Sequence, residues 1–161
     1  MKASYRQSGF TLIELVVVII LLGIISTYAA SRYIGKSSFS TFAAQEQAIS
    51  IIRQIQLGRM YSNVSDATAV SESNYRLSVS SDCLGSVSSC ASGASDSSNR
   101  LTVDDGNLSF SSTLSPVTFD LLGNPLSAAG ELLSAPVTIT ISNGSESNRV
   151  CINPQGYVYG C

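Results

Sequence analysis

One carboxylate stands alone near the start of the chain, and it needs a partner. Glu14 is the single charged side chain between Phe10 and Ala30, a stretch that is otherwise almost entirely apolar. A charged side chain inside a membrane segment costs about 2.5–3.5 kcal/mol on insertion scales, and such residues are usually paired. No Lys, Arg or His lies within one helical turn of Glu14. Cleavage after Gly9 would create an ammonium group on Phe10, and in an assembly the Glu14 of one subunit could neutralise the Phe10 ammonium of its neighbour.

The apolar stretch that carries Glu14 has the length of a membrane span. An α-helix rises about 1.5 Å per residue, so residues 10–30 would extend about 31 Å, which matches the hydrocarbon thickness of a bilayer. The preceding residues 1–9 carry Lys2 and Arg6 and no acid, which favours a cytoplasmic N-terminus. A secretory signal peptide is the alternative, but the run is too long and no small-x-small cleavage site directly follows Ile25.

This N-terminal pattern resembles the class III signal of type IV pilins and pseudopilins. Residues 9–14 read Gly-Phe-Thr-Leu-Ile-Glu, behind a short basic leader and ahead of a long apolar run. The resemblance implies that a prepilin peptidase cleaves between Gly9 and Phe10 and that Phe10 is then N-methylated. It also implies that Glu14 sets the register between subunits, and that residues 10–30 serve as both membrane anchor and filament core.

Residues 31–62 are expected to continue the same helix in amphipathic form. No proline interrupts them, and their apolar residues recur at i, i+4, i+7, i+8 and i+11, which is one face of a helix. These residues are Ala44, Ala48, Ile51, Ile52 and Ile55. The pattern predicts one helix of about fifty residues, whose bare first half is followed by a second half packed against a globular head.

Residues 63–161 are expected to form that head as an antiparallel sheet. Alternation of apolar and polar residues over 75–79 is typical of a half-buried strand. Residues 101–103 and 108–110 are expected to pair as a hairpin around an Asp-Asp-Gly-Asn turn. Other β-branched and aromatic runs predict strands over 117–119, 137–141, 149–152 and 157–159. The predicted fold class is α+β, with the long N-terminal helix packed on the sheet.

The four cysteines of an exported chain predict two disulfides rather than a zinc site. Cys83 and Cys90 lie in a segment in which 10 of the 21 residues from Ser78 to Ser98 are serine. Such a segment buries little, and a bridge between these two cysteines would restrict it.

Cys151 and Cys161 form the other local pair, although four cysteines allow three connectivities. The sequence Asn-Pro-Gln-Gly at 153–156 predicts a tight turn between them. A two-residue hairpin at this turn would place Cys151 opposite Val158. The local pairing then requires the last residues to curl back.

Composition argues against an enzyme and against a nucleic-acid partner. The chain has no His, which removes the Ser-His-Asp and Cys-His systems and the commonest transition-metal ligand, so neither a cofactor nor a metal is expected. Loss of Lys2 and Arg6 with the leader leaves 7 basic against 11 acidic side chains. Arg149 is the only cation near the C-terminus, whereas non-specific DNA affinity rests on several phosphate contacts.

A second resemblance covers the C-terminal third. Residues 117–125, 137–141 and 149–158 are similar to the head of the FimT and type II secretion H class of minor pilins, and the whole chain is most similar to the C-type minor pilins of mannose-sensitive haemagglutinin (MSHA) pili.

This implies a minor pilin that primes or caps a filament and supports surface attachment. Its implied partners are other major and minor pilins and the prepilin peptidase/methylase. Its implied location is the inner membrane, with a periplasmic head, and then the extracellular pilus. The alternatives are a tip-located binding module, for adhesion or DNA uptake, and a pseudopilin of a type II secretion system.

Overall fold

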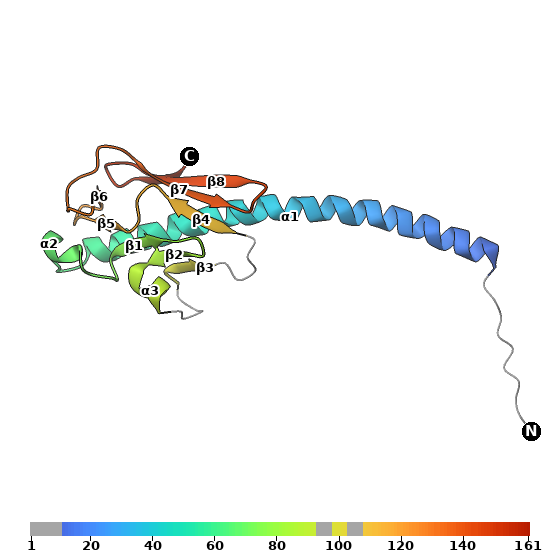
Figure 1. Cartoon of the computed structure of the whole chain (residues 1–161), viewed down its shortest axis with the longest axis horizontal. Helices are drawn as coiled ribbons and strands as arrows, with labels where there is room; N and C mark the ends of the chain where they lie inside the picture. The colour runs from blue at the N-terminus through green and yellow to red at the C-terminus, as the bar shows by residue number, and fades with distance from the viewer. Residues whose placement is uncertain (1–10, 93–97, 103–107) are drawn as a thin grey trace, which may run out of the picture. The chain divides into compact units, whose positions relative to one another are not determined.

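The computed structural model describes the backbone of residues 11–92, 98–102 and 108–161, and the side chains of these residues except 28–40 and 66–67. The chain divides into two units, Met1–Lys36 and Ser37–Cys161. Figure 1 labels the elements in chain order, beginning with the long helix α1 (Leu12–Met60). Antiparallel β-sheets follow it, so the fold is α+β with the layout of a pilin, as predicted.

The second half of α1 buries the stripe of apolar residues that its spacing predicts. All five predicted residues are buried, and Ala48 and Ile52 are completely inaccessible. Thr41 and Ile49 are buried beside them. The stripe is therefore confirmed as the face of the helix that packs against the head.

Among the described residues, nine strands form two antiparallel sheets in the second unit. The first sheet has the order β3-β2-β1-β5-β6 and the second the order β4-β7-β8-β9. The first contains β1 (Arg76–Val79), β2 (Cys83–Ser86), β3 (Arg100–Thr102), β5 (Val117–Phe119) and β6 (Pro125–Leu126). The second contains β4 (Ser109–Ser112), β7 (Val137–Ser142), β8 (Ser147–Ile152) and β9 (Val158–Gly160). Two short helices, α2 (Asp66–Ala69) and α3 (Val87–Ala91), complete the described elements.

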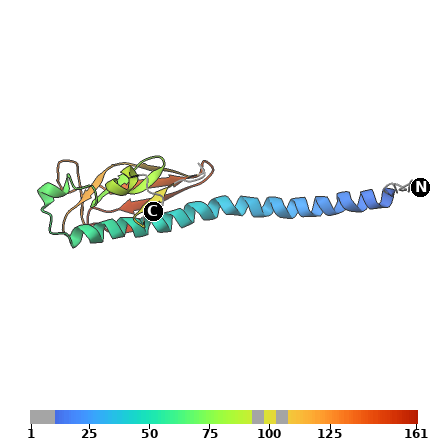
Figure 2. The ribbon, with the colours of Figure 1, turned by 90° about the horizontal axis from the view of Figure 1, so that it is seen from below.

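Both sheets share one core with α1. Figure 2 shows the strands gathered along one side of the second half of α1. The helix contributes its buried stripe, the first sheet contributes residues such as Leu77 and Phe119, and the second contributes Ile139 and Ile152. Each fully buried aliphatic or aromatic side chain contributes about 1.5–3 kcal/mol, so this shared core holds helix and sheets together.

The predicted hairpin of residues 101–103 and 108–110 is wrong. β3 pairs with β2, where Leu101 lies opposite Leu84, and β4 pairs with β7, where Phe110 lies opposite Ile141. The two runs therefore belong to different sheets, and the single predicted sheet is two sheets. A turn-forming sequence indicates a change of direction but does not select the partner. Here β7, with six residues that alternate between buried and half-buried, offers Phe110 a place in the core.

The predicted register at the C-terminus is also wrong by one residue. Cys151 lies opposite Tyr159, not Val158, because the turn has three residues between Asn153 and Tyr157. The Asn153 N–H donates to Tyr157 O at 3.0 Å, and Gly156 adopts a positive φ of 79° that a three-residue hairpin turn requires. Cys161 then lies two residues beyond Tyr159 on the same face. The Cys151–Cys161 disulfide forms across 5.9 Å between Cα atoms, without any curl of the terminus.

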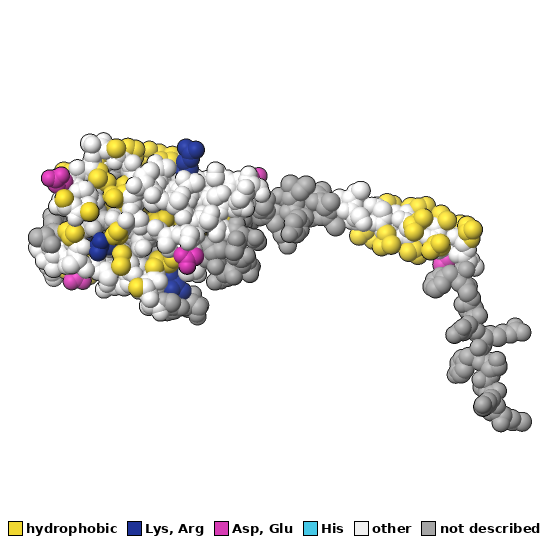
Figure 3. All heavy atoms as spheres, viewed as in Figure 1, with side chains coloured by type: hydrophobic (Ala, Val, Ile, Leu, Met, Phe, Trp, Pro, Cys, Tyr) yellow, Lys and Arg dark blue, Asp and Glu magenta, His cyan; other side chains and the backbone are white. Residues whose placement is uncertain are grey.

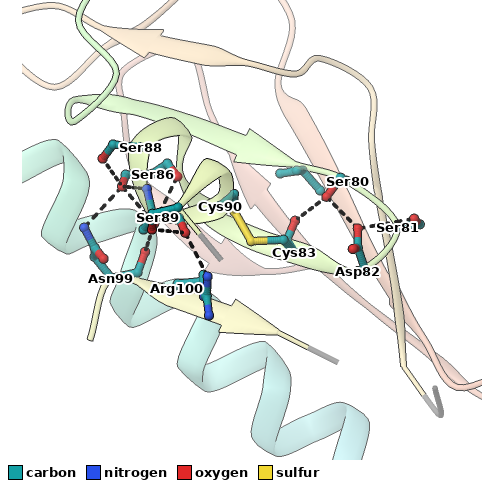
Figure 4. The surroundings of a disulfide bond; sticks show 12 residues. Ser80, Ser81, Asp82, Cys83, Ser86, Ser88, Ser89, Cys90, Asn99 and Arg100 are labelled. Atoms are coloured by element: carbon teal, nitrogen blue, oxygen red, sulfur yellow. Dashed lines mark hydrogen bonds between the residues drawn. A yellow bond between two sulfur atoms is a disulfide. The ribbon is translucent and has the colours of Figure 1, made fainter. Parts of the chain in front are cut away.

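The serine-rich segment contains β2, α3 and the Cys83–Cys90 disulfide that joins them (Figure 4). Ser86 caps α3, because its Oγ accepts the N–H of Ser89 at 3.2 Å, and both side chains are buried. Arg100 on β3 donates to Ser89 O at 2.9 Å. The serines bury more than their composition predicts, because their hydroxyls form hydrogen bonds within the segment.

Candidate functional site

The predicted site residues fall in different parts of the chain. Gly9 and Phe10, the predicted cleavage and methylation residues, lie outside the described residues. Glu14 lies in the first turn of α1. The four cysteines lie in the second unit, where they form two local pairs. The candidate site is therefore the start of α1, and the disulfides belong to the head.

The first turn of α1 is capped by Thr11. Its Oγ1 accepts the backbone N–H of Glu14 at 3.3 Å, and its carbonyl oxygen accepts the N–H of Leu15 at 3.2 Å. The Thr-x-x-Glu spacing is that of a capping box. An acidic side chain in the first turn is also favoured by the positive end of the helix macrodipole. The Thr11 cap thus places Glu14 in the first turn of the helix, one turn after the predicted cleavage point.

Behind this turn, α1 carries apolar side chains on every side. Their exposed fractions run from 36% at Val16 to 81% at Leu12, and Figure 3 shows hydrophobic side chains, in yellow, over much of the visible face of this segment. The exposed large side chains are Leu12, Ile13, Leu15, Val16, Val17, Val18, Ile19, Ile20, Leu21, Leu22, Ile24 and Ile25. A helix that is hydrophobic all round is stable when lipid or protein surrounds it, so this segment requires lipid or protein packed around it.

The hydroxyl groups at the end of this segment are satisfied within the helix. Ser26 Oγ donates to Leu22 O at 2.7 Å, and Thr27 Oγ1 donates to Ile24 O at 2.8 Å. Side-chain hydroxyls bound to the preceding turn do not demand water. These two residues are therefore compatible with an apolar environment.

The predicted membrane span extends beyond the described side chains. Residues 10–30 include Phe10 and the side chains of 28–30, which lie outside the description. Within the described residues, no helix is both long enough and apolar enough to span a membrane.

Polar side chains that the sequence pattern does not single out attach α1 to the sheets. Gln56 Nε2 donates to Gly123 O and to Gly156 O, both at 2.9 Å. Arg59, which is completely buried, donates through Nε to Phe119 O at 3.0 Å. A signal for both was present, because positions 56 and 59 extend the buried stripe at i+4 and i+7 from Ile52.

The comparisons with known proteins find one match, and it covers the start of the chain. Residues 4–30 match the family model of the prokaryotic N-terminal methylation motif. No curated protein and no solved structure matches the chain. The motif implies processing by a prepilin peptidase and assembly with other pilins, the role of a structural subunit. The chain is thus type IV pilin-like, with a methylation motif at its N-terminus and a pilin layout in its fold.

Proposed function

We propose that this chain is a minor pilin of an MSHA-type type IV pilus, similar to the C type, which helps to prime or cap the filament and supports surface attachment. The observation that carries the proposal is the bare apolar surface of α1 from Leu12 to Ile25, which lies within the residues that match the methylation motif. Such a surface suits a subunit that is first held in the inner membrane and later built into a filament. Lipid covers the surface before assembly, and a bundle of helices covers it afterwards.

In this function the chain begins as a single-pass protein with a cytoplasmic N-terminus and a periplasmic head. The peptidase removes residues 1–9, and methylation of the new Phe10 amine keeps its positive charge. The Glu14 carboxylate of one subunit then pairs with the Phe10 ammonium of the next. Two opposite charges in an apolar, low-dielectric core attract strongly, and leaving either unpaired is costly. This pairing sets the register of the filament.

The head supports the minor-pilin assignment through its strands. The regions that resemble the FimT and type II secretion H class contain β5 and overlap β6, β7, β8 and β9. The two disulfides close the serine-rich segment and the C-terminus, which suits a head that works outside the cell.

Quantitative mass spectrometry of filaments sheared from cells tests the proposal. We expect an N-terminal peptide that starts at methylated Phe10 and an amount far below that of the most abundant pilin. Dominance of this chain would make it the major subunit and replace the minor-pilin assignment. Absence from filaments together with retention of residues 1–9 would overturn the pilin function itself.

Variants of the candidate site separate processing from assembly. Glu14→Ala is expected to leave cleavage after Gly9 intact and to reduce incorporation into filaments. Gly9→Val is expected to block cleavage and leave a longer, membrane-held precursor. Glu46→Ala is the matched control, since Glu46 is an exposed carboxylate on the same helix within the head. Wild-type incorporation of Glu14→Ala would refute the register role.

A second candidate function has one observation in its favour. The rings of Tyr157 and Tyr159 stack with centroids 5.4 Å apart, and Tyr157 is 61% exposed. A stacked aromatic pair with one exposed ring suits a binding module at the filament tip. For that function, Tyr157→Ser would reduce adhesion while the number of pili stays constant. Unchanged adhesion would count against the tip-binding alternative.

A further inference from the structure

The turn between β5 and β6 exposes a leucine side chain to solvent. Leu122 is 77% exposed. Asp120 Oδ1 accepts the backbone N–H of Leu122 at 2.9 Å and that of Asn124 at 2.8 Å, and Asn124 Nδ2 donates to Asp120 Oδ2 at 2.8 Å. Gly123 adopts a φ of 86°, which favours glycine. The turn is therefore rigid, and it presents an apolar side chain that the core does not use.

Leu122 borders a shallow groove of about 220 Å³ on the surface of the head. Three of its lining residues are large, apolar and exposed: Leu57 at 51%, Met60 at 43% and Leu122 at 77%. We name this surface the Leu122 groove, and its described lining residues are Arg53, Gln56, Leu57, Met60, Leu122, Gly123 and Gly156. Exposed apolar side chains that cluster in a groove are typical of an interaction site.

The Leu122 groove is formed in advance by hydrogen bonds from α1. Gln56 Nε2 holds the carbonyl oxygens of Gly123 and Gly156, which belong to turns of different sheets. The two turns approach so closely that a Cβ on Gly156 would collide with Gly123 O. Arg53 donates to Val158 O at 2.8 Å beside the groove. A partner therefore meets a fixed surface and loses little free energy in ordering it.

The chemistry of the groove selects its occupant. Arg53 is the one charged side chain among the described lining residues, and it is bound to a backbone carbonyl. The apolar segment of α1 has no charge between Leu15 and Thr27, and its side chains lack cover within the described first unit. An uncharged helix can enter this groove without burying an unpaired charge, and apolar helix faces commonly dock in such grooves.

We propose that the Leu122 groove receives the apolar helix of a neighbouring subunit, as residues 12–25 of a second copy of this chain would provide. Leu122 inserts between side chains of that helix, and Leu57 and Met60 contact its flank. The inference rests on the proposed function, because it requires assembly of subunits. It assigns to the β5–β6 turn a role in covering the helix that leaves the membrane.

Photo-crosslinking in whole cells tests the contact on the full chain. A benzophenone amino acid replaces Leu122, and a matched control places it at Ser145, an exposed residue of the β7–β8 turn. After irradiation, mass spectrometry identifies the peptides joined to each position. We expect Leu122 adducts to the apolar N-terminal helix of another subunit, about tenfold above Ser145. Adducts to head peptides or lipid, or a yield equal to that at Ser145, overturn the proposal.

Two leucine variants provide an independent test of the contact at the Leu122 groove. Leu122→Ser and Leu132→Ser each remove an exposed leucine, at 77% and 65% exposure, and neither is expected to unfold the head. Recovery in sheared filaments is expected to fall about tenfold for Leu122→Ser and to stay constant for Leu132→Ser. Equal recovery overturns the groove contact. Absence of the wild-type chain from filaments would refute the proposed function. The cross-linked adducts formed in cell membranes would still show whether the apolar helix of another subunit occupies the Leu122 groove.

Discussion

Isoleucine side chains have opposite surroundings in the two halves of α1. Ile19 and Ile24 in the first half are 58% and 63% exposed, whereas Ile52 and Ile55 in the second half are 0% and 3% exposed. Residue type and helix geometry are the same, so helix propensity does not separate the halves. What differs is the partner surface: two sheets of the same chain cover the second half. The fold requires burial of the second half, and assembly requires burial of the first.

The largest expected effect comes from placing a carboxylate in each half. Ile52→Asp buries an unpaired charge in the shared core and is expected to unfold the head, at a cost above about 4 kcal/mol. Ile19→Asp should leave thermal unfolding of the head unchanged. It should reduce membrane insertion instead, by about 2.5–3.5 kcal/mol on insertion scales. A head destabilised equally by both variants would show that the halves are not independent.

Removal of a disulfide tests whether covalent closure stabilises only the head. Paired Cys83→Ser and Cys90→Ser substitutions open a bridge with a sequence separation of 7. The chain-entropy model gives a loss of about 2.5 kcal/mol. Thermal unfolding of the full chain measures this loss of stability. Membrane insertion of the apolar first half of α1, which should not change, is the internal control. A loss below about 0.5 kcal/mol would mean that the hydrogen bonds of Ser86 and Ser89 already order the segment.

The polar attachment of the second half is tested at Gln56. Gln56→Ala leaves the carbonyl oxygens of Gly123 and Gly156 without their donor, which is expected to cost about 2 kcal/mol. Gln54→Ala is the matched control, since Gln54 is exposed on the same helix and its loss should stay within about 0.5 kcal/mol. Equal unfolding temperatures for the two variants would show that apolar packing alone holds the helix to the sheets.

Periodicity made much of this comparison predictable from the sequence. The change from an uninterrupted apolar run to a stripe with Ala48 and Ile52 predicts the bare half and the packed half of α1. The strands predicted over 137–141 and 149–152 are confirmed as parts of β7 and β8, which pair with each other. Both features depend on residues near one another in the chain, so local spacing contains the information.

Contacts between distant residues were harder to predict. The pairing of β4 with β7 depends on which strand offers Phe110 a buried place, and that is a property of the assembled core. Gln56 and Arg59 are polar, so an analysis of apolar spacing passes over them although they lie on the buried face. The one-residue shift beside Cys151 depends on Gly156 in a left-handed conformation, which the Asn-Pro-Gln-Gly sequence permits but does not require.

The smallest expected effect concerns the cap at the start of the bare half. Thr11→Ala removes the oxygen that accepts the Glu14 N–H, and a lost N-cap costs about 1 kcal/mol. Exchange of the Glu14 amide hydrogen, measured on the full chain in detergent micelles, should therefore become about fivefold faster. Thr11→Ser keeps the hydroxyl and should exchange as the wild type does.

Thermal unfolding of the head should be the same in all three proteins, because Thr11 contributes to the other half of α1. An unchanged exchange rate in Thr11→Ala would mean that the turn is held by other groups. A faster rate with normal filament incorporation would separate the cap from the register role of Glu14, since a carboxylate paired with a neighbouring ammonium does not need its own amide to be protected. A faster rate with reduced incorporation would instead show that the cap positions the carboxylate for that pairing.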